Sequence, residues 1–162
     1  MDNFKIKFYF NIIFLISLIS LISAYFIEYI LGYQPCNLCL IERIPYGLSI
    51  ILIIVNHLFN IDKKFLILIL VLIFIFSLLI SIYHLGIEQG VFEESAVCGL
   101  KGASEIFTKD ELLKQLKQRT ISCKDVTFRI FGFSLTTINI ILNLIIIITF
   151  SWIFKNYAKF KS

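Results

Sequence analysis

Residues 65–80 read FLILILVLIFIFSLLI, a run in which every residue except Ser77 is apolar. No Asp, Glu, Lys or Arg follows until residue 88, so the charge-free stretch 65–87 holds 23 residues. An α-helix rises about 1.5 Å per residue and crosses the hydrocarbon core of a membrane with about 20 residues. Apolar side chains on every side leave no face that would contact water. The stretch therefore predicts a transmembrane helix.

Three further stretches lack charged residues over a similar length: 8–27, 44–61 and 130–154, with 20, 18 and 25 residues. Hydrophobic residues make up 59% of the 162 residues and charged residues 16%, whereas soluble domains have roughly 45–50% and about 25%. This composition excludes a disordered, nucleic-acid-binding or ordinary cytosolic protein, and so short a chain cannot bury four such helices inside polar structure. We expect an all-α membrane protein, a four-transmembrane-helix bundle that forms a single integral membrane domain over residues 1–162.

The first apolar stretch also needs to be compared with a signal peptide. Lys5 and Lys7 precede it, as basic residues precede the apolar core of a cleaved signal. Its apolar part is longer than such a core, and Ser23-Ala24 makes a poor cleavage site. We expect the first span to be retained as a membrane anchor.

The basic residues predict how the bundle is oriented. Four spans bring both termini to one face, where segments 1–7, 62–64 and 155–162 carry seven Lys and Arg in 18 residues. The opposite face, with segments 28–43 and 88–129, carries eight spread over 58 residues. Dense Lys and Arg next to a membrane mark its cytoplasmic side. Both termini should therefore be cytoplasmic and the two longer loops extracytoplasmic.

All four cysteines fall in these two loops. Cys36 and Cys39 lie between the first and second spans, and Cys98 and Cys123 lie between the third and fourth. Both loops emerge on the same side of the membrane, the side on which disulfides persist. The spacing suggests two pairs in two extracytoplasmic cysteine loops.

Residues 36–39 read CNLC, a C-x-x-C sequence of the kind found in zinc sites and in redox centres. The sequence follows Pro35 where a helix starts, a place at which backbone N–H groups favour a thiolate. Helical residues three apart have Cβ atoms about 5–6 Å apart, whereas a disulfide needs about 3.8 Å. A disulfide here would distort the turn and exchange readily. Since Pro45 would break a helix begun at Cys36, we expect a separate short turn, with the membrane helix restarting near Pro45.

Charged residues at the same membrane face allow more than one interpretation. Arg43 lies one turn after Cys39 and beside Glu42. It is an interfacial arginine that extends toward the headgroups, a local partner of an acidic neighbour, or a fixed positive charge that stabilises a Cys39 thiolate or a reduced ligand oxygen. His84, with Glu88 four residues further on, is either a polar residue at headgroup level or a ligand contact.

Two features of the loops concern the membrane boundary. Thr108 and Glu111 match a capping box and predict a helix over 109–119, which lies on the bilayer, against a partner or over its own loop. Glu28, at the end of the first span, is interpreted as a boundary residue.

Residues 32–46, GYQPCNLCLIERIPY, resemble the signature of the DsbB disulfide bond formation proteins. Residues 83–88 (YHLGIE) and 131–134 (FGFS), followed by Asn139, agree with that family in order and spacing. One departure is Ile138, where relatives often have Trp. The resemblance covers nearly the whole chain.

This resemblance implies an enzyme, a protein-dithiol:quinone oxidoreductase of the bacterial inner (cytoplasmic) membrane. Such an enzyme reoxidises a periplasmic, thioredoxin-like dithiol oxidase of the DsbA type and passes the electrons to membrane quinone, either ubiquinone or menaquinone. By resemblance, Cys36 and Cys39 pass electrons to the quinone, which Arg43 assists. Cys98 and Cys123 exchange with the partner protein, and His84 corresponds to a histidine near the quinone. The resemblance implies no metal and no nucleic acid.

The sequence leaves other classes of protein open. A non-enzymatic membrane scaffold with two structural disulfides would explain the even number of cysteines. A thiolate metal-binding membrane protein would use the cysteines as zinc ligands, although the second pair lacks zinc-knuckle spacing and the thiols face an oxidising compartment. An enzyme similar to vitamin K epoxide reductase also carries a C-x-x-C and a loop pair on four helices, but there the order of the motifs fits less well.

Overall fold

The structure, a computed structural model, describes residues 2–59, 61–93, 98, 122–124, 128–130 and 132–157. Among these residues, four helical segments are long and apolar enough to cross a membrane: Ile6–Tyr29, Asn37–Phe59, Lys63–Glu88 and Leu135–Lys155. The predicted four-helix bundle is therefore confirmed. The elements follow the order α1 (Asp2–Tyr29), α2 (Asn37–Ile41), α3 (Ile44–Phe59), α4 (Lys63–Glu88), β1 (Arg129–Ile130), β2 (Phe133–Ser134) and α6 (Leu135–Lys155).

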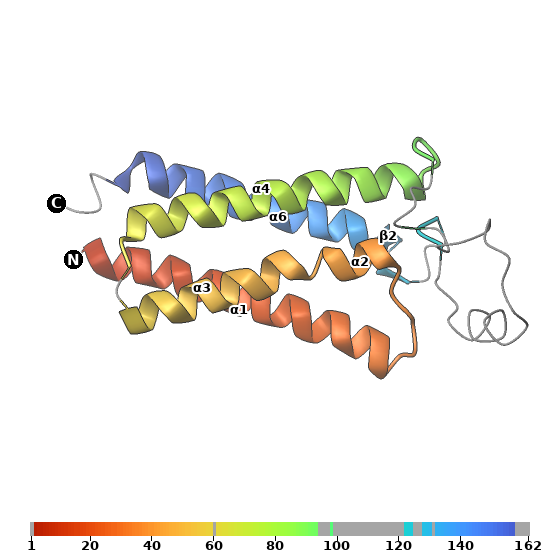
Figure 1. Ribbon diagram of the computed structural model, residues 1–162, viewed down its shortest axis with the longest axis horizontal. Coiled ribbons are helices and arrows are strands. Elements are labelled where there is room, and N and C mark those ends of the chain that lie inside the picture. The colour runs from red at the N-terminus through yellow and green to blue at the C-terminus, as the bar shows by residue number, and fades with distance from the viewer. Residues whose placement is uncertain are drawn as a thin grey trace, which may run out of the picture.

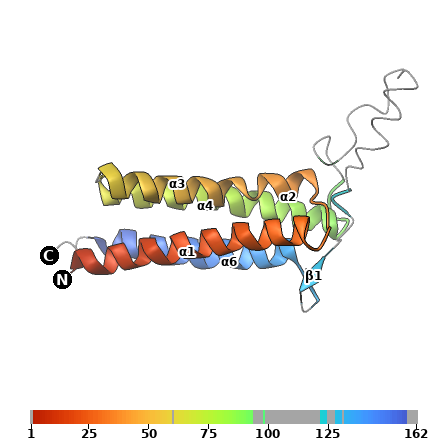
Figure 2. The same ribbon diagram turned by 90° about the horizontal axis from the view of Figure 1, so that it is seen from below.

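The long helices run side by side, and both termini lie at the same end of the bundle (Figure 1). Helices α3 and α4 form one layer, and α1 and α6 form the other (Figure 2). Helices α1 and α4 extend slightly beyond the predicted spans 8–27 and 65–87, because residues with charged side chains also occupy their first and last turns. The helix predicted over 109–119, with its capping box at Thr108 and Glu111, lies outside the described residues.

The second span is divided in the way that Pro45 predicts. The short helix α2 ends at Ile41, and α3 begins at Ile44, one residue before the proline. Proline is tolerated in the first turn of a helix because the N–H groups there have no partner inside the helix. Glu42 and Arg43 therefore lie at a junction between two helices and project from it in different directions.

The predicted start of the fourth span at residue 130 is wrong, because α6 begins only at Leu135. Ser134 caps this helix, and its hydroxyl accepts a hydrogen bond from the Thr137 N–H at 3.2 Å. The preceding residues form a small antiparallel ribbon, β1 with β2, which turns through Gly132 at a φ of 85°. Only glycine adopts such a φ readily. A lack of charge marks an apolar segment but not the residue at which its helix starts.

Aromatic side chains fill the core from the end of the bundle that carries the termini to its middle. Phe10, Phe74 and Phe150 are all buried to 1% exposure or less, and the rings of Phe10 and Phe150 lie 6.0 Å apart. The outer surface is apolar as well: Phe76 and Ile148 are 62% and 67% exposed. Soluble proteins rarely expose apolar patches larger than a few hundred Å². Such a surface is suited to the hydrocarbon of a membrane.

Several polar side chains inside the bundle are paired with one another between helices, whereas Oδ1 of the buried Asn56 has no hydrogen-bond partner among the described residues. Asn143 of α6 donates to the Ser77 hydroxyl of α4 at 3.0 Å, and the hydroxyls of Ser17 on α1 and Ser49 on α3 lie 2.8 Å apart. In lipid, a polar group without a partner costs several kcal/mol, so these pairs help to hold the helices in register. The network continues toward the end of the bundle that carries the cysteines.

Candidate functional site

Cys36 is the residue that caps the short helix α2. Its backbone is extended, and its sulfur accepts a hydrogen bond from the Cys39 N–H at 3.2 Å. The first N–H groups of a helix have no partner inside it, so a side-chain acceptor at this position satisfies one of them. The Cys36 side chain is only 6% exposed, and Cys36 and Cys39 are both free thiols. The C-x-x-C thus places one buried and one half-buried sulfur at the start of the second span.

The imidazole of His84 lies against Cys36. Its Nε2 atom is 3.4 Å from the Cys36 sulfur, and its Nδ1 atom is 3.0 Å from Oε1 of Glu42. His84 is 2% exposed, so the ring is enclosed by protein inside the bundle. A contact with quinone stays a prediction.

Glu42 is held from three helices. Its Oε2 atom accepts a hydrogen bond from the Asn139 amide at 3.0 Å, and the same amide donates to Ser81 at 2.8 Å. The Tyr46 hydroxyl donates to the amide oxygen of Asn139. A buried carboxylate is stable only when it is paired and hydrogen-bonded. Residues of α3, α4 and α6 therefore determine where the Glu42 carboxylate lies.

A second carboxylate lies close to His84. Oε1 of Glu88 is 3.8 Å from the His84 Nε2 atom and accepts a hydrogen bond from the Thr136 hydroxyl at 2.5 Å. The Thr136 hydroxyl is also 3.3 Å from Nδ1 of His84. The imidazole is therefore enclosed by acceptors from both the α2–α3 junction and its own helix.

Arg43 reaches toward α1 and pairs with Glu28. Its Nη1 atom lies 2.5 Å from Oε2 of Glu28, and its guanidinium sits 5.0 Å from the centre of the Tyr25 ring. The sequence argument allowed a pair with an acidic neighbour, and the structure gives Glu28 of α1, not the adjacent Glu42, as that partner. Consecutive residues cannot face the same direction in helical backbone, so Glu42 turns into the bundle while Arg43 turns toward α1. Glu28 thus lies at the end of the first span and also holds the Arg43 side chain in an ion pair.

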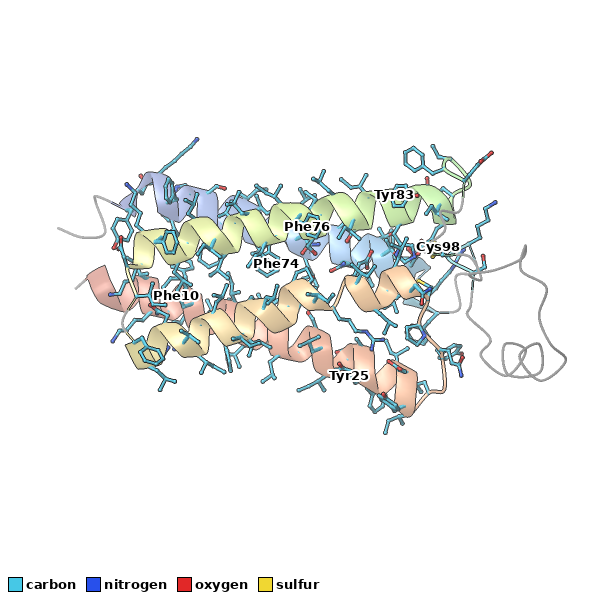
Figure 3. The ribbon with its side chains drawn as sticks, in the orientation of Figure 1. Phe10, Tyr25, Phe74, Phe76, Tyr83 and Cys98 are labelled. Carbon is cyan, nitrogen blue, oxygen red and sulfur yellow. A yellow bond between two sulfur atoms is a disulfide. The ribbon has the colours of Figure 1, made fainter. Side chains whose placement is uncertain are left out.

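Cys98 and Cys123 form a disulfide, with their Cα atoms 5.6 Å apart. Both are buried, at 2% and 3% exposure, and they share one apolar cluster with Cys36, Leu38 and Ile87. Cys39 packs against the edge of this cluster. Figure 3 shows Cys98 at the end of the bundle where α2 lies, far from Phe10. The predicted placement of both cysteine pairs at one end of the bundle is confirmed.

The surroundings of Cys36 favour the ionised form of its thiol. A hydrogen bond from the Cys39 thiol, with further contributions from His84 and the Cys39 N–H, lowers the pKa of Cys36 from 9.0 to about 5, although burial acts in the opposite direction. A thiol that is ionised near neutral pH is a nucleophile and a metal ligand. The sequence argument considered Arg43 as the cation that stabilises a Cys39 thiolate, whereas the described contacts favour a Cys36 thiolate beside His84.

The site adjoins an apolar groove between the α2–α3 segment and α4. Its volume is about 300 Å³, and nearly all of its lining is apolar. The lining residues are Ile41, Ile44, Pro45, Leu48, Leu72, Ile73 and Phe76. Because Ile41 and Ile44 flank Glu42 and Arg43 in the chain, the groove begins next to the charged junction. It could hold an apolar ligand within reach of the C-x-x-C helix.

Sequence reasoning found the four cysteines, Arg43 and His84 but assigned no role to Glu42 or Asn139. Their partners are far away in the chain: Glu42 meets His84 across 42 positions and Asn139 across 97. The one signal available was general, since carboxylates and amides at the edge of an apolar span are costly unless they have partners. That signal points to a function but does not identify the partner.

The chain is similar to known proteins over most of its length. Residues 6–153 match the family described as disulfide bond formation protein DsbB. An uncharacterized protein of Rickettsia prowazekii (strain Madrid E), RP370, is 36% identical over 139 residues, which cover 82% of this chain and 78% of the relative. No solved structure matches the chain. The chain therefore belongs to the DsbB family and is a multi-pass membrane oxidoreductase of disulfide bond formation.

Proposed function

We propose that this protein is a dithiol:quinone oxidoreductase that reoxidises a periplasmic, thioredoxin-like dithiol oxidase of the DsbA type. The observation that carries the proposal is the shared apolar cluster of Cys36, Cys98 and Cys123, with Cys39 at its edge. Thiol–disulfide exchange requires one sulfur to attack another. Two cysteine pairs that pack together at one end of the bundle need only a short movement to exchange.

Electrons enter through the loop disulfide. A thiolate of the reduced partner attacks the Cys98–Cys123 bond and forms a mixed disulfide, which the second partner thiol resolves as the oxidised partner leaves. The two electrons now reside in the Cys98 and Cys123 thiols. These thiols then reduce a Cys36–Cys39 disulfide, and their own bond forms again. Each exchange breaks one S–S bond and makes one.

The residues around the C-x-x-C suit a membrane quinone, which supplies an acceptor for two electrons and two protons. The groove lined by Ile41, Ile44 and Phe76 would hold an apolar tail, and Arg43 would orient a polar head through its guanidinium N–H groups. Arg43 is itself positioned by Glu28 and by the Tyr25 ring. Cys36 and Cys39 provide the electrons, and the apolar walls of the groove exclude water.

The orientation that we propose puts the cysteines in the periplasm, both termini in the cytoplasm and the helices in the bacterial inner membrane. It rests on the dense Lys and Arg at the termini and on the need for an oxidising compartment. A membrane-impermeant thiol reagent added to intact cells after reduction should label Cys36 and Cys39. Labelling only after the cells are broken would contradict this orientation.

Turnover of the purified protein tests the proposal. The protein in detergent, given a reduced DsbA-type dithiol protein and quinone, should consume the two in a one-to-one ratio. Parallel assays with ubiquinone and menaquinone would identify the preferred acceptor. A membrane scaffold with structural disulfides would give no consumption of either substrate.

A metal-binding function is the second candidate, and one observation favours it. The sulfurs of Cys36 and Cys39 and a ring nitrogen of His84 all lie within 4.8 Å of one another. A histidine that ligates zinc usually donates its other N–H to a carboxylate, as His84 does to Glu42. Zinc analysis of the reduced protein after dialysis separates the candidates, because a metal protein retains one equivalent, whereas the redox enzyme turns over in the presence of a chelator.

A further inference from the structure

His84 stands between a nucleophile and a carboxylate. The Cys36 sulfur is 3.4 Å from Nε2, and Oε1 of Glu42 is 3.0 Å from Nδ1. A sulfur or oxygen nucleophile in hydrogen-bond reach of a base, with that base oriented by a third group, is the arrangement that activates nucleophiles in enzymes. The three side chains come from the loop before α2, the α2–α3 junction and α4, so only the fold brings them together.

Glu42 determines which ring nitrogen of His84 can accept a proton. Since a carboxylate only accepts hydrogen bonds, the proton of the neutral ring lies on Nδ1, which donates to Glu42. Nε2 then carries the lone pair, and it points at Cys36. The other Glu42 oxygen accepts from Asn139, whose own orientation is set by Tyr46 and Ser81. The network therefore prepares Nε2 to accept a proton.

We propose that His84 is the base that takes the proton of the Cys36 thiol, and that Glu42, held by Asn139, is the residue that positions it. The role of this pair in turnover rests on the proposed function. The step is a proton transfer: the Cys36 S–H bond breaks, an N–H bond forms at Nε2, and no electron moves. When Cys36 and Cys39 later close to a disulfide, two electrons pass to the quinone. Its reduction to the quinol takes up two protons, the Cys36 proton from His84 and the proton of the Cys39 thiol.

The groups that face the Cys36–His84 contact come from several elements. Cys39 lies on α2, Glu42 at the α2–α3 junction and Glu88 on α4, while α6 contributes the uncharged Thr136. Arg43 is engaged by Glu28 on the side of α1. Among the described residues around this contact, His84 is thus the group that can add a positive charge beside the Cys36 sulfur.

The direct test measures how readily Cys36 is alkylated at each pH. Full-length protein in detergent is reduced, freed of reductant and pulsed with iodoacetamide, and the Cys36 peptide is quantified by mass spectrometry. Removing the cation beside a thiolate raises its pKa, so His84→Gln should move the midpoint of the alkylation profile upward by about one pH unit or more. His57→Gln is the matched control, because His57 is exposed near the opposite end of α3 and should leave the midpoint unchanged.

Glu42→Gln tests the positioning residue without removing the base. It should lower kcat by about tenfold or more while leaving the KM for quinone unchanged, and Glu42→Asp should restore part of the loss. Helical circular dichroism and formation of the Cys98–Cys123 disulfide confirm that each variant is folded. An unchanged alkylation midpoint in folded His84→Gln overturns the proposal. The alkylation profile needs neither quinone nor partner, so a shifted midpoint in a protein without turnover would overturn the proposed function alone.

Discussion

Nδ1 of His84 lies 3.0 Å from Oε1 of Glu42, although the two residues are 42 positions apart in the chain. One belongs to the third span and the other to the junction that Pro45 creates in the second. The contact links the helix that carries the histidine to the residues that follow the C-x-x-C. It makes the chemistry of Cys36 a property of the packed bundle.

Replacing single cysteines should separate the two halves of the electron path. Cys36→Ser or Cys39→Ser should abolish quinone reduction by any dithiol, because no disulfide can form at the acceptor side. Cys98→Ser or Cys123→Ser should block electrons from the DsbA-type partner but spare quinone reduction by a small dithiol that reaches the C-x-x-C directly. Quinone absorbance reports both reactions. Turnover that persists with the partner in all four variants would disprove the path.

Arg43→Ala should weaken the use of quinone. A hydrogen bond from a charged group contributes about 1.5–3 kcal/mol, so the apparent KM for quinone should rise roughly tenfold to a hundredfold. Arg43→Lys keeps the charge but loses the planar donor fork, and it should give an intermediate value. Steady-state kinetics with excess dithiol partner measures both. An apparent KM equal to that of the wild type would show that Arg43 only pairs with Glu28.

The reduced protein should carry one thiolate at unusually low pH. Because hydrogen bonds from Cys39 and His84 lower the pKa of Cys36 to about 5, the thiolate should be present above that pH and lost as the pH falls through it. An ordinary cysteine ionises near pH 8.5. The ultraviolet absorbance of the thiolate, followed during acidification, should show this transition, and Cys36→Ser should lack it. A first transition near pH 8 or 9 would contradict the assignment.

Two phenylalanines two positions apart on α4 should differ in their effect on stability. Phe74 is fully buried in the bundle, whereas Phe76 is 62% exposed on its outside (Figure 3). Phe74→Ala leaves a cavity and should reduce the free energy of unfolding by about 3–5 kcal/mol. Phe76→Ala should change it far less, because lipid or detergent replaces the lost contacts. Denaturant unfolding in detergent measures both free energies. Equal losses would contradict the assignment of Phe74 to the inside of the bundle and Phe76 to its outside.

Local rules of composition and geometry account for what could be predicted. An uncharged stretch such as 65–87 can be recognised as a membrane span without knowledge of the rest of the fold. Its length is sufficient, and the free-energy cost of placing a charged side chain in hydrocarbon depends on that residue alone. Pro45 lacks an N–H and predicts the break between α2 and α3 for the same local reason. The predicted start at residue 130 was taken from the first uncharged residue after Arg129. The helix α6 begins later, after its cap Ser134.

The sequence by itself determined the number of spans, the placement of both cysteine pairs at one end and the helix break between the C-x-x-C and Pro45. Only the tertiary structure decided that Glu42 faces His84 while its neighbour Arg43 pairs with Glu28, and that Asn139 joins the site from α6. The physical reason is that hydrophobicity and backbone geometry act within a segment. A buried carboxylate or imidazole takes its partner from whichever helix packs against it.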